Sequence, residues 1–180
     1  MAEILFRGFH KDENGNQNII LNGEYIKGYW VYGYYIKHLP YTPAPMARNV
    51  EKVKKQIEKD TVHCIAKDSF SDCGTKRSID MLEVIKETVG QYTGLNDING
   101  YKIFTGDLIT WENVNELGEI NKVSPYEVIL SDKYYYGFVA QKEFKRKTGI
   151  TFLQFSFIEI WKKNIKIVGN IYDKSQIESE

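Results

Sequence analysis

Hydrophobic and polar residues alternate along much of the second half of the chain. In Thr151–Phe157 three apolar residues share one side of an extended strand and polar residues take the other: Leu153, Phe155 and Phe157 against Gln154 and Ser156. A period of two is typical of half-buried β-strands. The same period recurs in three further runs, Ile165–Ile171, Tyr126–Leu130 and Leu108–Trp111. Turn signals such as Asn99-Gly100 and Thr148-Gly149 separate the runs, which predicts a small β-barrel or sandwich.

The first part of the chain is less uniform and is predicted to be a mixed β region with one short helix. In Arg48–Lys59, Val50, Val53 and Ile57 recur at helical spacing among charged residues, which predicts an amphipathic helix. Further strands are predicted at Ile4–Arg7, Trp30–Lys37, Val62–Ala66 and Met81–Ile85. We expect two parts, a mixed N-terminal β region over residues 1–87 and a C-terminal β domain over 88–180.

The run Trp30–Lys37 is apolar on both of its faces. One face carries Trp30, Tyr32, Tyr34 and Ile36, and the other carries Tyr29, Val31 and Tyr35. A strand of this kind is buried on both sides or has a partner on its second face. We therefore take Trp30, Tyr32 and Tyr34 as candidate interface residues for a protein partner or for self-association.

Charge limits the classes of partner. Lys and Arg number 24, as do Asp and Glu, so the formal net charge is zero and a strongly basic nucleic-acid-binding surface over the whole protein is excluded. Four cations nevertheless cluster before the turn at Thr148-Gly149, namely Lys142, Lys145, Arg146 and Lys147. Aromatic residues precede them in the sequence. The four cations are candidate nucleic-acid-binding residues. The alternative is a solvated turn whose cations protect an aromatic strand from edge aggregation.

No motif assigns a catalytic residue, a metal or a cofactor. Phosphate loops, nucleophile elbows and zinc helices do not occur in the sequence. An enzyme would need carboxylates brought together by the fold, such as Asp107 with Glu112 or Glu119. His63, Cys64 and Cys73 do not match zinc spacing, and Asp97–Gly100 fits a tight turn rather than a calcium loop. Met1–His10 carries Glu3 and Arg7 and does not resemble a secretory signal, so a cytoplasmic protein is expected. The sequence has no run of 18 apolar residues, so no membrane partner is expected.

Three stretches resemble the YopX-like family of phage and prophage proteins: WVYGYYIK at Trp30–Lys37, TVGQYTGLNDINGYKIFTGDL at Thr88–Leu108, and VGNIYD at Val168–Asp173. The middle block, with D-x-N-G and then G-D, is the most specific. The resemblance implies a mainly β protein of a bacterial host cell, with a C-terminal SH3-like barrel that begins around Gly106-Asp107. It carries over no catalytic residues.

These observations favour a non-enzymatic protein-interaction or self-assembling module encoded by a phage or prophage. The alternative is a nucleic-acid-binding protein in phage genome handling or regulation. Neither hypothesis requires a cofactor.

Overall fold

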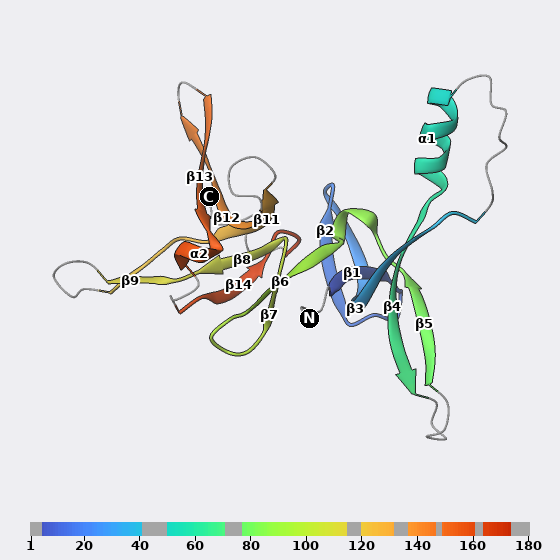
Figure 1. Cartoon of the computed structure of the whole chain (residues 1–180), viewed down its shortest axis with the longest axis horizontal. Coiled ribbons are helices and arrows are strands. Elements are labelled where there is room, and N and C mark those ends of the chain that lie inside the picture. The colour runs from blue at the N-terminus through green and yellow to red at the C-terminus, as the bar shows by residue number, and fades with distance from the viewer. Residues whose placement is uncertain are drawn as a thin grey trace. The chain divides into compact units, whose positions relative to one another are not determined.

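A computed structural model describes residues 5–40, 50–70, 77–114, 120–131, 137–146, 149–160 and 164–173 (Figure 1). The protein is mainly β, as the alternating pattern predicts, and the sheets formed by the described residues are antiparallel and open. The chain divides into two compact units. The N-terminal unit comprises residues 5–17 and 27–89, and the C-terminal unit comprises residues 18–26 and everything described from Gly90 onward. None of the helices in the described ranges is long and apolar enough to cross a membrane.

The N-terminal unit is built on four antiparallel strands in the order β5-β4-β3-β1. Their bounds are Phe6–Lys11 for β1, Glu24–His38 for β3, Val62–Phe70 for β4 and Arg77–Glu83 for β5. A 3-10 turn, η1, follows at Lys86–Thr88. The predicted strand at Trp30–Lys37 therefore lies within a longer strand, and β5 begins four residues before the predicted Met81.

One face of this sheet packs into a core. Val31, Ile65 and Val84 are buried, and five half-buried apolar residues surround them: Phe6, Tyr29, Tyr35, Leu82 and Val89. Gly33 lies where the backbones approach closely, because a Cβ added there would be 2.1 Å from the carbonyl oxygen of Ala66. The glycine permits this close approach of β4 next to Tyr34, where the pairing of β3 with β4 begins.

The predicted helix is present as α1, Val50–Asp60, and it does not enter the core. None of its residues is buried. A single residue, Thr61, joins α1 to β4, and its backbone N–H donates to the carbonyl of Ile57 at 2.9 Å. α1 stands beyond the N-terminal end of β4 (Figure 1). Lys86 Nζ lies 3.2 Å from Glu58 Oε1, an exposed ion pair between η1 and the helix.

The C-terminal unit contains a five-stranded antiparallel sheet in the order β13-β12-β11-β8-β14. These strands span Asp107–Thr110 (β8), Tyr126–Ser131 (β11), Gly137–Arg146 (β12), Gly149–Ser156 (β13) and Lys166–Asn170 (β14). Further elements complete the unit: β2 Gln17–Leu21, β6 Gly90–Asn96, β7 Lys102–Phe104, β9 Glu112–Val114, β10 Ile120–Lys122 and α2 Phe157–Ile160. In β2 only residues from Asn18 onward belong to this unit, and in β3 only Glu24–Ile26 do.

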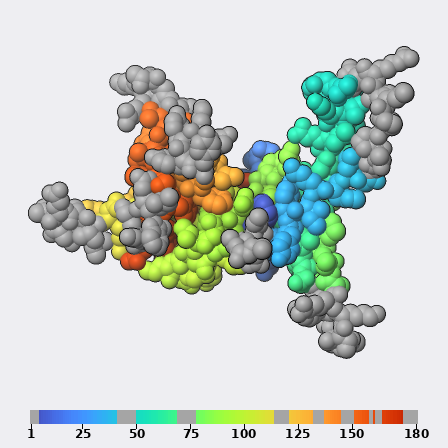
Figure 2. Space-filling model, viewed as in Figure 1, coloured from blue at the N-terminus to red at the C-terminus, as the bar shows by residue number. Residues whose placement is uncertain are grey.

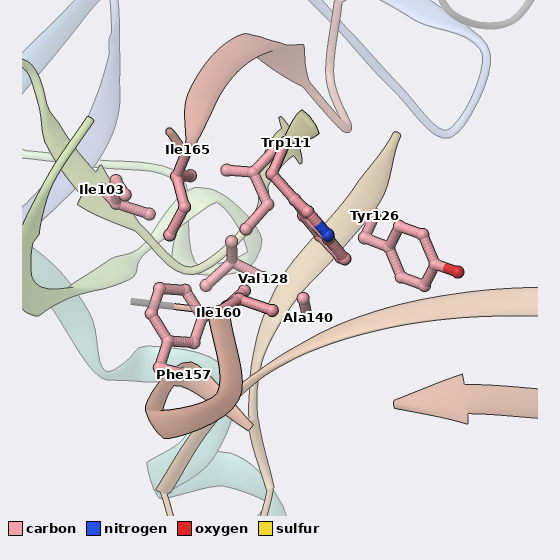
Figure 3. Packing of buried hydrophobic residues seen from close by; sticks show 9 residues of the cluster. Ile103, Trp111, Tyr126, Val128, Ala140, Phe157, Ile160 and Ile165 are labelled. Atoms are coloured by element: carbon pink, nitrogen blue, oxygen red, sulfur yellow. The ribbon is translucent and has the colours of Figure 1, made fainter. Parts of the chain in front are cut away.

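The core of this unit lies beside β8, β11 and α2. Trp111, Tyr126 and Phe155 form three mutual ring contacts with centroids 5.0–5.6 Å apart. Phe157 and Ile160, the two ends of α2, lie in the same buried cluster as Val128 and Ala140 of the sheet (Figure 3). Burial of these large apolar side chains is the main stabilising contribution to the unit.

The predicted SH3-like barrel is not confirmed, because the strands that the structure describes do not close into a barrel. Among them, β13 and β14 stand at the two ends of the strand order and do not pair with each other. The predicted common face of Leu153, Phe155 and Phe157 is also wrong in part: Leu153 is 43% exposed, and Phe157 belongs to α2. Leu153 pairs with Lys142, one residue beyond the last β12 residue that β11 reaches, so it lies where the sheet has narrowed to two strands.

Candidate interaction surfaces

The D-x-N-G motif closes a turn with a buried carboxylate. Asp97 Oδ1 accepts hydrogen bonds from the backbone N–H groups of Asn99 at 2.8 Å and Tyr101 at 2.9 Å. Its Oδ2 accepts from the backbone N–H of Ile167 in β14, at 3.4 Å. Gly100 has φ 85°, which glycine adopts without strain. The motif thus holds a tight turn, as predicted, and also ties it to a strand 70 residues away.

The G-D motif works in the same way on the next turn. Asp107 is 2% exposed. Its Oδ2 accepts from the Phe104 N–H at 2.8 Å, and its Oδ1 accepts from Asn170 Nδ2 at 3.2 Å. Asn170 Oδ1 in turn accepts from the Tyr172 N–H at 3.1 Å, and Asp173 Oδ2 accepts from the Asn170 N–H at 2.7 Å. Residues from two of the motif-bearing stretches therefore hold each other by charge-assisted hydrogen bonds.

The carboxylates considered for an enzyme are placed differently from one another. Asp107 is buried and engaged by Phe104 and Asn170, whereas Glu112 is exposed at the start of β9. Glu119 lies outside the described residues. These hydrogen bonds give Asp107 a structural role.

The candidate interface residues of β3 separate into two environments. Trp30 is half-buried, with the Arg7 guanidinium 4.8 Å from its ring centroid and the Phe9 ring edge-on at 5.4 Å. Tyr32 and Tyr34 are 49% and 57% exposed. The second apolar face of β3 is therefore covered at Trp30 and open at Tyr32 and Tyr34.

Register extends the open part across two more strands. Residues directly opposite each other in antiparallel strands share a face. Tyr34 pairs with Ala66, which pairs with Met81, and Ile36 pairs with Cys64. We call five exposed residues on this side the open sheet face: Tyr32, Tyr34, Ile36, Ile79 and Met81. In Figure 2, β3, coloured blue, forms part of the viewed surface of its unit.

Two acidic residues border the open sheet face. Asp68 pairs with Ile79, and Glu83 pairs with Cys64, so both lie on the same side of the sheet as the apolar residues. Both are exposed. Ile79 and Met81 are not among the residues that the sequence singles out. Their alternation with Asp80 and Leu82 is a strand signal, but only the register with β4 shows that they extend the tyrosine surface.

The opposite face of the sheet holds a tyrosine–histidine pair. Tyr35 Oη and His63 Nδ1 are hydrogen-bonded and their rings stack, with centroids 5.8 Å apart. Burial lowers the pKa of His63, and the nearby cations Lys86 and Lys37 lower it further, against a smaller opposing effect of Glu87. Cys64, the next residue in the sequence, pairs with Ile36 and lies on the side of the open sheet face. The side chains of His63 and Cys64 therefore point to opposite sides of the sheet. Among the described residues no cluster of metal-ligating side chains forms, and Cys73 lies outside them.

The basic residues lie on a two-stranded ribbon. β11 pairs with β12 only as far as Gln141, whereas β12 and β13 remain paired to Arg146 and Gly149. Residues 142–146 and 149–153 thus form an arm that extends past β11 (Figure 1). Lys142 Nζ donates to Ser124 Oγ at 2.8 Å and lies 5.7 Å from the Phe144 ring centroid. Lys145 and Arg146 are described by their backbone alone, and Lys147 lies outside the described residues.

The fold and these surfaces define a mainly β protein with two sheet-based units, an open apolar sheet face in one and a projecting ribbon in the other. The family model described as YopX protein matches residues 46–177, and the chain belongs to that family. The matched range includes the motifs built around Asp97, Asp107 and Asn170, while Trp30–Lys37 lies before it. No match was found among curated proteins.

Proposed function

We propose that this protein is a non-enzymatic protein-interaction module, encoded by a phage or prophage, and that it acts in the bacterial cytoplasm through the open sheet face. The observation that supports this most directly is the exposure of large apolar side chains in register on neighbouring strands. Ile79 is 70% exposed and Met81 50%, beside the two half-exposed tyrosines.

The size of the surface supports a binding role. Taking about 150–200 Å² for a fully exposed large side chain, the five residues expose on the order of 400–500 Å². The largest apolar patches on monomeric proteins measure about 300–600 Å² and are often functional. Tyrosine and methionine are enriched at interfaces because they provide large contact areas and adaptable packing.

Site-specific photo-crosslinking in a producing bacterial cell tests the proposal. A photoreactive phenylalanine analogue replaces Tyr34, and in a matched control it replaces Tyr101, which is 68% exposed in the C-terminal unit. We expect position 34 to give a discrete product that is sensitive to protease and insensitive to nuclease, and position 101 to give none. Equal labelling at the two positions, or no product at either, would refute a protein-binding role for this face.

The projecting ribbon supports a second candidate function, binding of nucleic acid. A two-stranded β-ribbon fits the major groove of duplex DNA, and this ribbon carries Lys142, Lys145 and Arg146, with Lys147 next in sequence. Three or four phosphate contacts predict a log–log salt dependence with a slope of about −3.

Filter binding to duplex DNA separates ribbon-specific binding from a general effect of charge. One variant replaces the four ribbon cations with alanine. The control replaces four lysines of α1 (Lys52, Lys54, Lys55 and Lys59) and so removes the same charge. Loss of binding in the first variant alone supports this function. Equal loss in both, or no binding at low salt, rules it out.

The finer description of the C-terminal fold is also a proposal. We infer that its five-stranded sheet is an open relative of an SH3-like barrel. The last strand, β14, returns beside the first, β8, after the meander β8-β11-β12-β13, so closure would need only the pairing of the two edges. NMR contacts between backbone protons of β13 and β14 would demonstrate a closed barrel in solution, and their absence would leave the sheet open.

A further inference from the structure

Strand β5 is an edge strand that lacks two of the usual protections, bulges and prolines. Within the part of the chain that the structure describes, it pairs along all seven residues with β4 and with no other strand. Exposed edges recruit other strands unless bulges, prolines or charged residues prevent it. The β4–β5 register is unbroken, and the sequence RSIDMLE contains no proline and one central charge, Asp80.

The sequence of β5 is complementary to itself in the antiparallel direction. If a second β5 is laid against the first with a two-fold axis through Asp80, Ile79 faces Met81 and Ser78 faces Leu82. In the same register Arg77 takes the position opposite Glu83 of the other copy, and the two-fold axis repeats this pair. The opposite charges at the two ends of β5 therefore face each other. Asp80 faces its own copy, the one like-charged pair against two oppositely charged pairs. Cross-strand pairs of this kind contribute modestly each, and the backbone hydrogen bonds supply the rest.

We propose that β5 pairs with β5 of a second copy of this chain, which joins the two N-terminal sheets into one. This inference rests on the proposed function and names a partner for that unit. Because the axis is perpendicular to the sheet, Ile79 and Met81 of both copies lie on the same side. The two open sheet faces then form one continuous apolar surface, and such an isologous contact closes as a dimer.

A cysteine placed on the axis tests the geometry directly. Directly opposed residues in antiparallel strands have Cα atoms about 4.5–5.5 Å apart, within the range of a disulfide. Under mild oxidation, Asp80→Cys should give a disulfide-linked dimer of twice the 21.0 kDa chain mass. Asp68→Cys, at an exposed position away from the axis, serves as the control and should give no more dimer than the unmodified protein.

Charge exchange tests the register. By sedimentation equilibrium, Arg77→Glu and Glu83→Arg should each weaken the dimer roughly threefold to tenfold, and the double variant should restore it. Asp80→Asn should strengthen it about twofold to fivefold, since the central repulsion is lost. The exposed Glu24→Arg, in the other unit, controls for net charge.

The outcomes separate this inference from the proposed function. A protein that stays monomeric at several hundred micromolar, or a double variant that does not recover, overturns the β5 pairing. If position 34 still crosslinks to another protein in that case, the open sheet face keeps its binding role without the dimer. Loss of position 34 crosslinking together with efficient Asp80→Cys dimers would overturn the binding role and leave the pairing intact.

Discussion

Replacing Asp107 with alanine tests whether the motif carboxylates act as structural clamps. The change removes the acceptor for the Phe104 N–H and for Asn170 Nδ2 at a position that is 2% exposed. A buried donor left without an acceptor costs about 1–3 kcal/mol, and bonds to a charged group contribute about 1.5–3 kcal/mol each. We expect the free energy of unfolding of the C-terminal unit to fall by about 3–5 kcal/mol.

An exchange of the two partners separates the hydrogen bond from the space that the side chains fill. Asp107→Asn alone sets an amide donor against the Asn170 amide donor and should cost about 1–3 kcal/mol. Adding Asn170→Asp restores a donor–acceptor pair, because the carboxylate introduced at position 170 can accept from residue 107 and still accept from the Tyr172 N–H. The double variant should return to within about 1 kcal/mol of the original protein.

Urea unfolding followed by circular dichroism gives these free energies, and amide hydrogen exchange at Phe104 reports the local bond. The alanine variant should lose protection at Phe104 before the rest of β7 and β8 does. A loss of stability below about 1 kcal/mol in Asp107→Ala, or a double variant as unstable as the sum of the two single variants, would show that this reasoning is wrong.

The other predictions concern the N-terminal unit. Gly33→Ala should destabilise it by about 3 kcal/mol in urea unfolding, because the new Cβ meets the Ala66 carbonyl. The control, Gly23→Ala in the C-terminal unit, places a Cβ with no atom within 4 Å and should cost that unit only about 1–2 kcal/mol for its positive φ. Because the pKa of His63 is lowered in the folded protein, the unfolded chain takes up a proton at a higher pH than the folded chain does. The free energy of unfolding should therefore decrease as pH falls below 6.5. His63→Gln should make this decrease smaller when unfolding is measured between about pH 7 and 5.5. Tyr34→Ser and Met81→Ser should change the free energy of unfolding by less than about 0.5 kcal/mol, because neither exposed side chain packs in the core, and a larger loss would indicate a structural role.

Local patterns in the sequence predict most of the secondary structure. The alternation in Ile165–Ile171 corresponds to β14, and the helical spacing of Val53 and Ile57 corresponds to α1. In the predicted Asn22-Gly23 and Asn99-Gly100 turns, Asn22, Gly23 and Gly100 have the positive φ values that these residue types tolerate. These features depend on neighbours within a few residues, so a single sequence contains the necessary information.

Features that depend on distant partners are predicted less well. Trp30 and Tyr34 lie in the same apolar alternation, yet Trp30 is covered by Arg7 and Phe9 while Tyr34 is exposed. The difference arises because Trp30 has β1 beside it, whereas Tyr34 has β4. Leu153 matches the alternation of a core strand but lies past the point that β11 reaches. Closure of the five-stranded sheet also depends on distant partners. Period-two alternation indicates which side chains share a face of a strand, but it does not indicate whether the two edge strands of a sheet pair.

The clamps at Asp97 and Asp107 also bear on the order in which the C-terminal unit is assembled. The bonds to Ile167 and Asn170 connect residues 70 and 63 positions apart. Contacts of such high sequence separation slow folding, because the loop entropy is lost before the contacts form. During synthesis on the ribosome, the turns at residues 97–107 emerge long before their partners, and the acidic side chains that hold the finished sheet remain hydrated until the last strand arrives.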